Sequence, residues 1–207
     1  MTNVIQIHPE SPQERLLIQV ARVLDNNGVI AYPTDSGYAL GCVIGEKAPL
    51  EKIRRIRKLE KNHLFTLMCS DLSSISEYAR VDNSNYRLLK ANTPGSYTFI
   101  LPATKSLPKL LKHSKRKTIG IRVPDNEISL GILLALGAPI LSVSLVMPEE
   151  DLPPADILEV EEVLQAKVDL LIDGGDCIVE PTSIVDLTEV EPVIIREGRG
   201  DIEPFTW

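Results

Sequence analysis

The sequence lacks the features that define several classes of protein. Its three cysteines, Cys42, Cys69 and Cys177, are odd in number and far apart, so no disulfide framework is expected and a reducing compartment suits the chain. Its three histidines are scattered without the spacing of zinc ligands, and we expect no metal site built by the protein. No apolar run approaches the ~20 residues of a membrane helix, and the N-terminus has no signal-peptide pattern. A cytoplasmic protein is therefore expected.

The common phosphate-binding and hydrolase motifs are also absent. No GxxxxGKS/T loop, GxGxxG fingerprint or nucleophile elbow occurs in the sequence. What is present is a chain of 207 residues, 43% of them hydrophobic, which is enough to bury one substantial core. We expect a single domain over residues 1–207.

The net charge of −7 hides an uneven distribution. Residues 145–207 contain 17 acidic and 3 basic residues, so residues 1–144 carry +7. Positive charge is concentrated in Glu51–Lys61 and in Lys105–Arg122, and the second stretch has seven Lys or Arg and no acidic residue. Such clusters attract polyanions such as nucleotide phosphates or an RNA backbone, although a solvated helix face is the commoner explanation of one cluster alone. Two basic stretches in an acidic chain favour an anionic partner.

Hydrophobic periodicity predicts alternating helices and strands. A stripe of apolar residues predicts a first helix between a capping box at Ser11–Glu14 and a C-cap at Asn27–Gly28. Val29–Tyr32 is predicted to be a strand that Pro33 ends. Further helices are predicted near residues 50–59, 86–90, 128–136 and 159–165, and strands over 64–69, 97–102, 118–124, 139–144, 168–173, 182–187 and 192–196. This alternation predicts an α/β fold, and the close spacing of the last strands argues against a purely parallel sheet.

Polar residues stand at the ends of several predicted strands. Ligands of open α/β sheets bind where strands end, so these residues are candidates for a binding site: Thr34, Arg122, Ser142, Ser144, Thr182, Ser183 and Arg196. Arg122 and Arg196 each close an otherwise apolar strand, where an unpaired guanidinium is costly to bury. An anionic ligand would satisfy them, and so would a salt bridge to one of the many carboxylates.

Six ordered segments resemble a known family. They are YPTDSGYALGC, NTPGSYTFIL, KTIGIRVP, PILSVS, PTSIVDLT and IIREG, between about Gly28 and Gly198. In these segments the sequence resembles the YrdC/YciO family and is most similar to its YciO branch. The resemblance implies a single YrdC-like domain with a twisted, mixed parallel and antiparallel sheet, flanking helices and a basic concave groove.

The same resemblance implies an activity. The best-known members are threonylcarbamoyl-AMP synthases, nucleotidyltransferases that convert L-threonine, bicarbonate and ATP with Mg²⁺ into threonylcarbamoyl-adenylate and pyrophosphate during tRNA modification. Some members bind double-stranded RNA. The expected cofactors and partners are therefore ATP with Mg²⁺, L-threonine and bicarbonate, and an RNA, with no membrane involved.

The resemblance implies a role for each matched residue. Thr34, Arg122, Ser142 and Thr182 would bind threonine or its carbamate, with Arg122 on the carboxylate. The ATP-binding set would be Arg57, Lys58, Thr118, Ser144 and Arg196. The family's Lys-x-Arg element matches Arg55 and Arg57, which would stabilise phosphate charge, although a one-residue shift would make its second member Lys58. From the residues alone, Asp35 and Ser36 are expected only to form a turn.

One departure from the synthase pattern bears on function. Synthases have Ser-x-Asn after a sheet strand, whereas this chain has Ser144, Leu145 and Val146, so an amide near the nucleotide is replaced by valine. Arginine also stands where lysine is usual at the phosphate. Two classes stay open. One is a synthase-type enzyme, weak or with an altered substrate. The other is a non-catalytic protein that binds double-stranded RNA, tRNA or rRNA through Arg54, Arg55, Arg57, Lys58, Lys115, Arg116 and Lys117.

Overall fold

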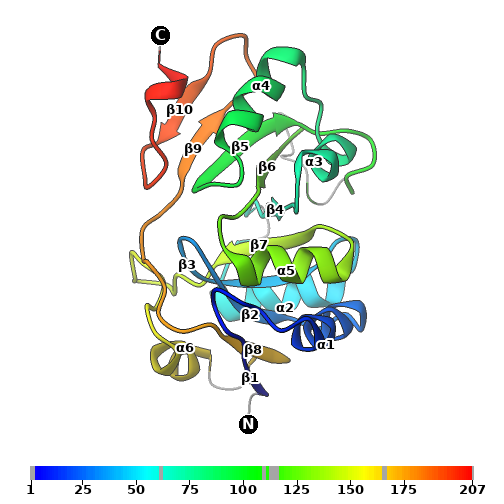
Figure 1. Cartoon of the computed structure of the whole chain (residues 1–207), viewed down its shortest axis with the longest axis vertical. Coiled ribbons are helices and arrows are strands. Elements are labelled where there is room, and N and C mark those ends of the chain that lie inside the picture. The colour runs from blue at the N-terminus through cyan, green and yellow to red at the C-terminus, as the bar shows by residue number, and fades with distance from the viewer. Residues whose placement is uncertain (1–2, 61–62, 109–110, 112–116, 165–166, 207) are drawn as a thin grey trace.

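A ten-stranded sheet runs through the computed structural model, which describes residues 3–60, 63–108, 111, 117–164 and 167–206 (Figure 1). Its strands are β1 (Val4–Gln6), β2 (Ile30–Thr34), β3 (Gly37–Val43), β4 (Thr66–Met68), β5 (Tyr97–Pro102), β6 (Thr118–Arg122), β7 (Ile140–Ser144), β8 (Leu170–Asp173), β9 (Ser183–Asp186) and β10 (Val193–Arg196). The helices are α1 (Glu14–Asp25), α2 (Lys47–Arg57), α3 (Leu72–Tyr78), α4 (Asn83–Asn92), α5 (Glu127–Leu136) and α6 (Ile157–Leu164), with a 3₁₀ turn at Glu203–Phe205. None of these helices has the length and apolar content needed to span a bilayer.

The sheet is mixed, as the sequence predicts. Its strand order is β1-β8-β2-β3-β7-β4-β6-β5-β9-β10. The pairs β1/β8, β8/β2, β4/β6 and β5/β9 are parallel, and the other neighbouring pairs are antiparallel. The loop between β9 and β10 is too short for the crossover that a parallel pair needs, so these strands form a hairpin.

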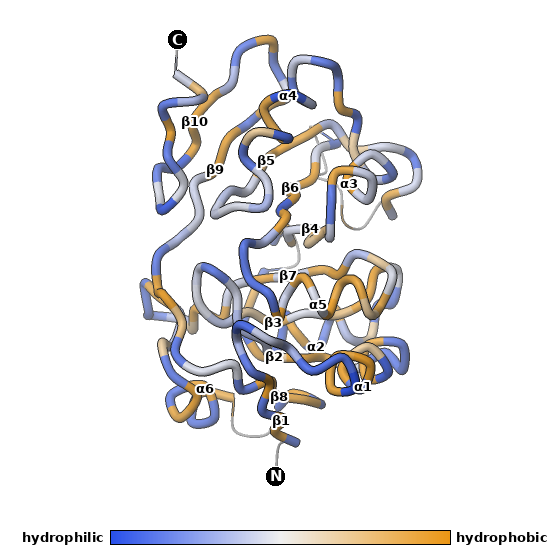
Figure 2. Tube along the Cα trace, in the orientation of Figure 1, coloured by the Kyte–Doolittle hydropathy of each residue, from blue (hydrophilic) through white to orange (hydrophobic). Residues whose placement is uncertain are grey.

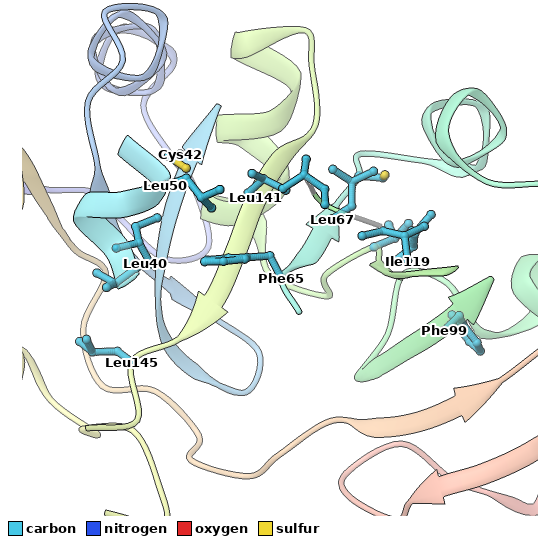
Figure 3. Close-up of a cluster of buried hydrophobic side chains, with 14 of the residues drawn as sticks. Leu40, Cys42, Leu50, Phe65, Leu67, Phe99, Ile119, Leu141 and Leu145 are labelled. Atoms are coloured by element: carbon cyan, nitrogen blue, oxygen red, sulfur yellow. The ribbon is translucent and has the colours of Figure 1, made fainter. Parts of the chain in front are cut away.

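Buried side chains form a core on each face of the sheet. Helices α1 and α5 pack on the first face, and this core contains no residue of β5, β6, β9 or β10. Helices α2, α3, α4 and α6 contribute to the larger core on the second face, which Figure 3 shows extending from Leu40 and Leu50 to Ile119 and Phe99. In Figure 2 the apolar stretches gather in β2, β8, α1 and α5, where both faces are covered. The first face of β5, β6, β9 and β10 is thus left outside either core.

Two predicted boundaries are wrong for local reasons. Helix α1 begins at Glu14, and the side chain of its N-cap Gln13 makes no capping bond to the helix but accepts from the N–H of His8 at 3.3 Å. The N–H of Ser11 donates to Nδ1 of His8 at 3.2 Å. Strand β2 continues through Pro33 to Thr34. Proline is tolerated there because β8 pairs with β2 only as far as Ala31, so no strand on that side needs a donor from residue 33.

Three elements were not predicted. Strand β3 occupies most of the segment YPTDSGYALGC, and it pairs with β2 as a tight hairpin whose turn is Asp35 and Ser36. Strand β1 and helix α3 are short and lack a strong apolar period. The predicted helices and strands are otherwise all present, with shifted ends.

We predict that a methyl group at Gly198 destabilises the fold. A Cβ there would collide with the carbonyl oxygen of Pro181, which is main chain and cannot rotate away. Gly198→Ala should therefore lower the free energy of unfolding by about 1–3 kcal/mol, measured by urea denaturation. Gly120→Ala is the control, because its Cβ would meet Cγ2 of Thr98 at an ordinary 3.4 Å. Equal stability of the two variants would contradict the packing around Gly198.

Candidate functional site

The sheet register brings the predicted site residues to one face. Residues paired across a ladder point to the same side, and so do residues two apart in a strand. Ser142 pairs with Thr66, which pairs with Gly120 of β6. Arg122 and Thr118 each lie two positions from Gly120 along β6, so they share that face. It is the first face of the sheet, which neither core covers at β5, β6, β9 and β10.

A buried ion pair joins the β2–β3 turn to β6. Nη2 of Arg122 donates to Oδ1 of Asp35 at 2.5 Å, and Nη1 donates to Oγ of Ser36 at 2.8 Å. The two charged side chains are only 8% and 4% exposed. The expectation that Asp35 and Ser36 merely form a turn is therefore wrong: they form the turn and also hold the arginine. A buried guanidinium needs such partners, and the turn is where the fold can supply two of them together.

Asp35 is itself held from three further places in the chain. Its Oδ2 accepts a hydrogen bond from Oγ of Ser96 at 2.7 Å, and Oδ1 also accepts from the N–H of Asp125 at 3.2 Å. Its carbonyl oxygen accepts from Nη1 of Arg199 at 2.7 Å. A carboxylate with this many donors is fixed in position, so the orientation of Arg122 is fixed as well.

One donor of Arg122 has no partner. Its Nε is buried and makes no hydrogen bond to any residue that the structure describes. A buried unsatisfied donor costs about 1–3 kcal/mol, which a ligand oxygen at that edge would recover. The salt bridge expected as an alternative to a ligand is thus present, but it satisfies only the two terminal nitrogens. The Nε donor is left without a partner among the described residues.

Hydroxyl pairs surround the arginine. Oη of Tyr32 and Oγ of Ser142 lie 2.7 Å apart, and Oγ1 of Thr98 and Oγ1 of Thr182 lie 3.0 Å apart. Thr34 donates its hydroxyl to the carbonyl of Gly37 at 2.6 Å. Burial raises the pKa of Tyr32 to about 12, so its phenol stays protonated at neutral pH. These groups can orient a ligand, but they do not form a general base.

Arg196 approaches the same hydroxyls from β10. Its Nε and Nη2 donate to the carbonyl of Thr182 at 3.0 and 2.7 Å, and Nη2 lies 3.2 Å from Oγ1 of the same residue. Burial, and then the positive charge of Arg122, lower its pKa. The structure therefore brings Arg196 into contact with Thr182 and within the electrostatic range of Arg122.

The basic end of α2 meets the end of β7. Nε of Arg57 donates to the carbonyl of Ser144 at 2.8 Å, and burial lowers the pKa of Arg57 to about 10, which leaves it charged at neutral pH. Lys58, in the left-handed C-cap position, and Arg55 are exposed. Arg54 is not on this surface: it is buried, paired with Glu51 at 2.6 Å and stacked over Phe65. Lys115 and Arg116 lie outside the described residues.

A hollow of about 340 Å³ lies along the open face. Its lining combines hydroxyls and a carboxylate with apolar side chains: Leu64, Phe65, Thr66, Thr98, Ile100, Leu111, Thr118, Ile119, Gly120, Ile184, Asp186 and Ile195. Thr118 and Thr98 connect it with the arginine region. The wall is mostly apolar, which suits the apolar part of an organic ligand, and Asp186 is the charged residue in the lining. Within the described ranges no three His, Cys, Asp or Glu residues are grouped as a metal site.

Sequence reasoning missed several residues of this site. Asp35, Ser96 and Arg199 position or support Arg122, and Tyr32 and Thr98 complete the hydroxyl pairs. The strand period could have indicated Tyr32, because it lies two residues from the predicted site residue Thr34, whereas Thr98 has no predicted site residue two positions away. Nothing in the sequence linked Asp35 to Arg122.

Fold and site together define a mixed α/β protein with an open sheet face beside a buried arginine, and comparison with known proteins gives its family. The family model described as "Telomere recombination" matches residues 22–198. The chain belongs to this Sua5/YciO/YrdC family. It is 58% identical to an uncharacterized protein of Haemophilus influenzae, over 99% of this chain and all of the other. It is 51% identical to the uncharacterized Escherichia coli protein YciO, over 99% and 100% of the two chains.

Solved structures and a more distant relative are also similar to this chain over most of its length. The crystal structure of E. coli YciO superposes with a TM-score of 0.95 over the whole of both chains. Sua5 of P. abyssi, solved with L-threonine, gives a TM-score of 0.87 at 24% identity, over 95% of this chain and 58% of its own, and shows the likeness of fold. A threonylcarbamoyl-AMP synthase of Nitrosococcus oceani is 29% identical over 86% of this chain and 91% of its own.

We predict that Arg122→Ala destabilises the protein as well as the site. The substitution leaves the carboxylate of Asp35 buried without its ion-pair partner, and breaking a buried pair from one side typically costs about 3–5 kcal/mol. Urea denaturation should show a loss of this size. Arg196→Ala is the control, because Arg196 is exposed and donates only to Thr182. Similar small losses in both variants would show that the Asp35 pair is not held as described.

Proposed function

We propose that the protein is an enzyme of the threonylcarbamoyl-AMP synthase type, which joins L-threonine, bicarbonate and ATP into threonylcarbamoyl-adenylate and pyrophosphate. The buried, unpartnered Nε of Arg122, with Arg196 within its electrostatic range, is the observation that carries the proposal. A synthase of this type has several anionic groups to bind, and the groove offers a separate donor set for each end of such a substrate pair. The synthase relative from N. oceani supports the same reading.

The threonine end would lie at Arg122. The carboxylate of threonine would accept from the Nε edge, and Ser142 and Thr182 would supply hydroxyls to the rest of the amino acid. Thr34 lies at the end of β2 beside the turn that holds the arginine, and its hydroxyl already contacts the carbonyl of Gly37. Its role would be to shape the pocket and to fix the turn.

The nucleotide end would use the apolar hollow and the outer arginines. Thr118 lines the hollow, and Ser144 holds Arg57 through its carbonyl. Arg57 and Arg196, with Lys58 or Arg55 at the rim, would neutralise the phosphates of ATP. Mg²⁺ commonly keeps several waters and is bound through substrate phosphates, so the lack of a three-residue metal cluster among the described residues is compatible with a Mg²⁺–ATP substrate.

The chemistry fits a site without a general base. The amine of threonine attacks the carbon of bicarbonate, water leaves, and a carbamate forms. A carbamate oxygen then attacks the α-phosphorus of ATP, and pyrophosphate leaves. The side chains near the groove would orient the reactants and neutralise charge on the phosphate oxygens, which is the main task of proteins in phosphoryl and nucleotidyl transfer.

Val146 should make this synthase slow. Valine offers neither donor nor acceptor to a phosphate, and the loss of one preorganised polar contact is worth on the order of 1–3 kcal/mol. With ATP, threonine, bicarbonate and Mg²⁺, the wild-type protein should form the adenylate and pyrophosphate slowly, and Val146→Asn should raise the rate about tenfold to a hundredfold. Val146→Ala is the control, because it removes methyl groups without adding an amide.

Two results would count against this proposal. If neither the wild type nor Val146→Asn forms any ATP-dependent product, the synthase function fails. If Val146→Ala accelerates turnover as much as Val146→Asn, the missing amide does not explain the rate.

A second candidate function is binding of double-stranded RNA or tRNA. Arg55 and Lys58 are exposed at the end of α2, and Lys117 is exposed beside β6, although Arg54 no longer contributes. Binding that neutralises phosphates releases counterions, so affinity should fall steeply with salt. Filter binding between about 50 and 200 mM salt should show this fall, and Arg55→Gln with Lys58→Gln should flatten it while Arg22→Gln does not. Absence of binding at low salt would remove this candidate.

A further inference from the structure

We propose that Asp35 is a selectivity residue, which reserves the Arg122 site for a monoanionic carboxylate and excludes phosphate from it. The inference rests on the proposed function, because it assigns the carboxylate of one substrate and the phosphates of the other to different arginines. Asp35 acts through Arg122 and through its own charge, without forming a bond to the substrate.

The fork of Arg122 is already occupied. Its two terminal nitrogens each donate to one residue of the β2–β3 turn, Nη1 to Ser36 and Nη2 to Asp35. Its remaining donor is Nε, which is buried and unpartnered among the described residues and would be the donor that a ligand engages. A ligand must therefore approach sideways, next to the ion pair, and cannot displace Asp35 from the fork without breaking a bond.

Asp35 cannot move aside when a ligand arrives. Ser96, Asp125 and Arg199 donate to its three oxygens, and they come from three separate loops. The negative charge therefore stays beside the bound anion. Both partners of the ion pair are almost fully buried, so this charge is weakly screened.

The charges of Arg122 and Asp35 both act on an incoming anion. Arg122 attracts it and Asp35 repels it, so the pair together offers a directed donor with little net attraction. A carboxylate carries one negative charge on a planar pair of oxygens and can accept from the Nε edge. A phosphate dianion is attracted and repelled twice as strongly, so the neutral pair gives it little more net attraction, while its larger desolvation cost is not offset by a second donor from the occupied fork.

The other arginines keep their full charge for phosphate. Arg57 donates to the carbonyl of Ser144, and Arg196 donates to the carbonyl and hydroxyl of Thr182. These acceptors are neutral oxygens, in contrast to the carboxylate on Arg122. Among the described residues the site thus has one arginine paired with a carboxylate and two arginines without such a partner, and this difference would separate carboxylate from phosphate.

Arginine NMR can test the proposal without turnover. Acetate and inorganic phosphate at pH 8 are titrated separately into ¹⁵N-labelled protein, and the Nε–H resonance of Arg122, assigned by its loss in Arg122→Lys, gives a dissociation constant for each. The wild type should bind acetate more tightly than phosphate at this group. Asp35→Asn should move the ratio of the two constants toward phosphate by at least about tenfold. Asp125→Asn, which removes a nearby charge but keeps the backbone contact to Asp35, should leave the ratio within about twofold.

An unchanged ratio in folded Asp35→Asn, or a wild type that prefers phosphate at Arg122, would overturn the proposal. If Asp35→Asn does not fold, the wild type still tests the proposal, because lowering the pH to about 5.5 converts phosphate to its monoanion. The affinity of phosphate for Arg122 should then rise relative to that of acetate. An unchanged ratio of the two affinities would contradict the role of Asp35. Product formation without the selectivity shift refutes this inference alone. A shift without any product refutes the synthase function alone.

Discussion

The buried pair between Asp35 and Arg122 is the interaction on which the site depends. It joins the β2–β3 turn to β6, although β7 and β4 lie between β3 and β6 in the sheet. The turn therefore folds over the open face instead of extending past the edge of the sheet. Because a buried ion pair is stable only with nearly complete hydrogen bonding, Ser96 and Asp125 donate to the same carboxylate, and Arg199 donates to the main-chain carbonyl of Asp35. The pair thereby ties together segments from both ends of the chain.

The groove exists because helices cover the sheet unequally. In the described residues, α1 and α5 pack over β1, β8, β2 and β3 on the first face, while β5, β6, β9 and β10 carry helices only on the second (Figure 1). A sheet face without a helix would expose large apolar side chains to water. Here the small or hydroxyl-bearing residues Thr66, Gly120 and Thr98 lie among apolar side chains such as Ile100 and Ile184, and the hollow forms between them.

The sequence predicted the fold better than the contacts within the site. Alternating apolar runs mark the strands, and the two-residue period already places Ser142 and Ser144 on one side of β7. Strand β3 was not predicted because Gly37 and Gly41 interrupt its apolar pattern. It is recognised as a strand only from its pairing with β2 and β7. The partner of Arg122 was beyond prediction from the residues, since 29 carboxylates were available and the correct one lies 87 residues away. Such a pairing is a property of tertiary structure.

The uneven distribution of charge along the chain is reflected in the contacts of the acidic segment. The acidic segment from residue 145 has only three basic residues, and two of them, Arg196 and Arg199, lie at the site. Elsewhere this segment offers carboxylates to the basic part of the chain, as in the 2.7 Å pair between Lys52 and Asp169, which joins α2 to the start of β8. Arg199 donates to a main-chain carbonyl and Arg196 donates to Thr182, so in the described residues neither forms a salt bridge with the acidic residues near it in sequence. An arginine that is not paired with a carboxylate keeps a positive charge that a ligand could use. In this acidic segment the separation arises because β10 lies at one edge of the sheet, away from the acidic helix α6.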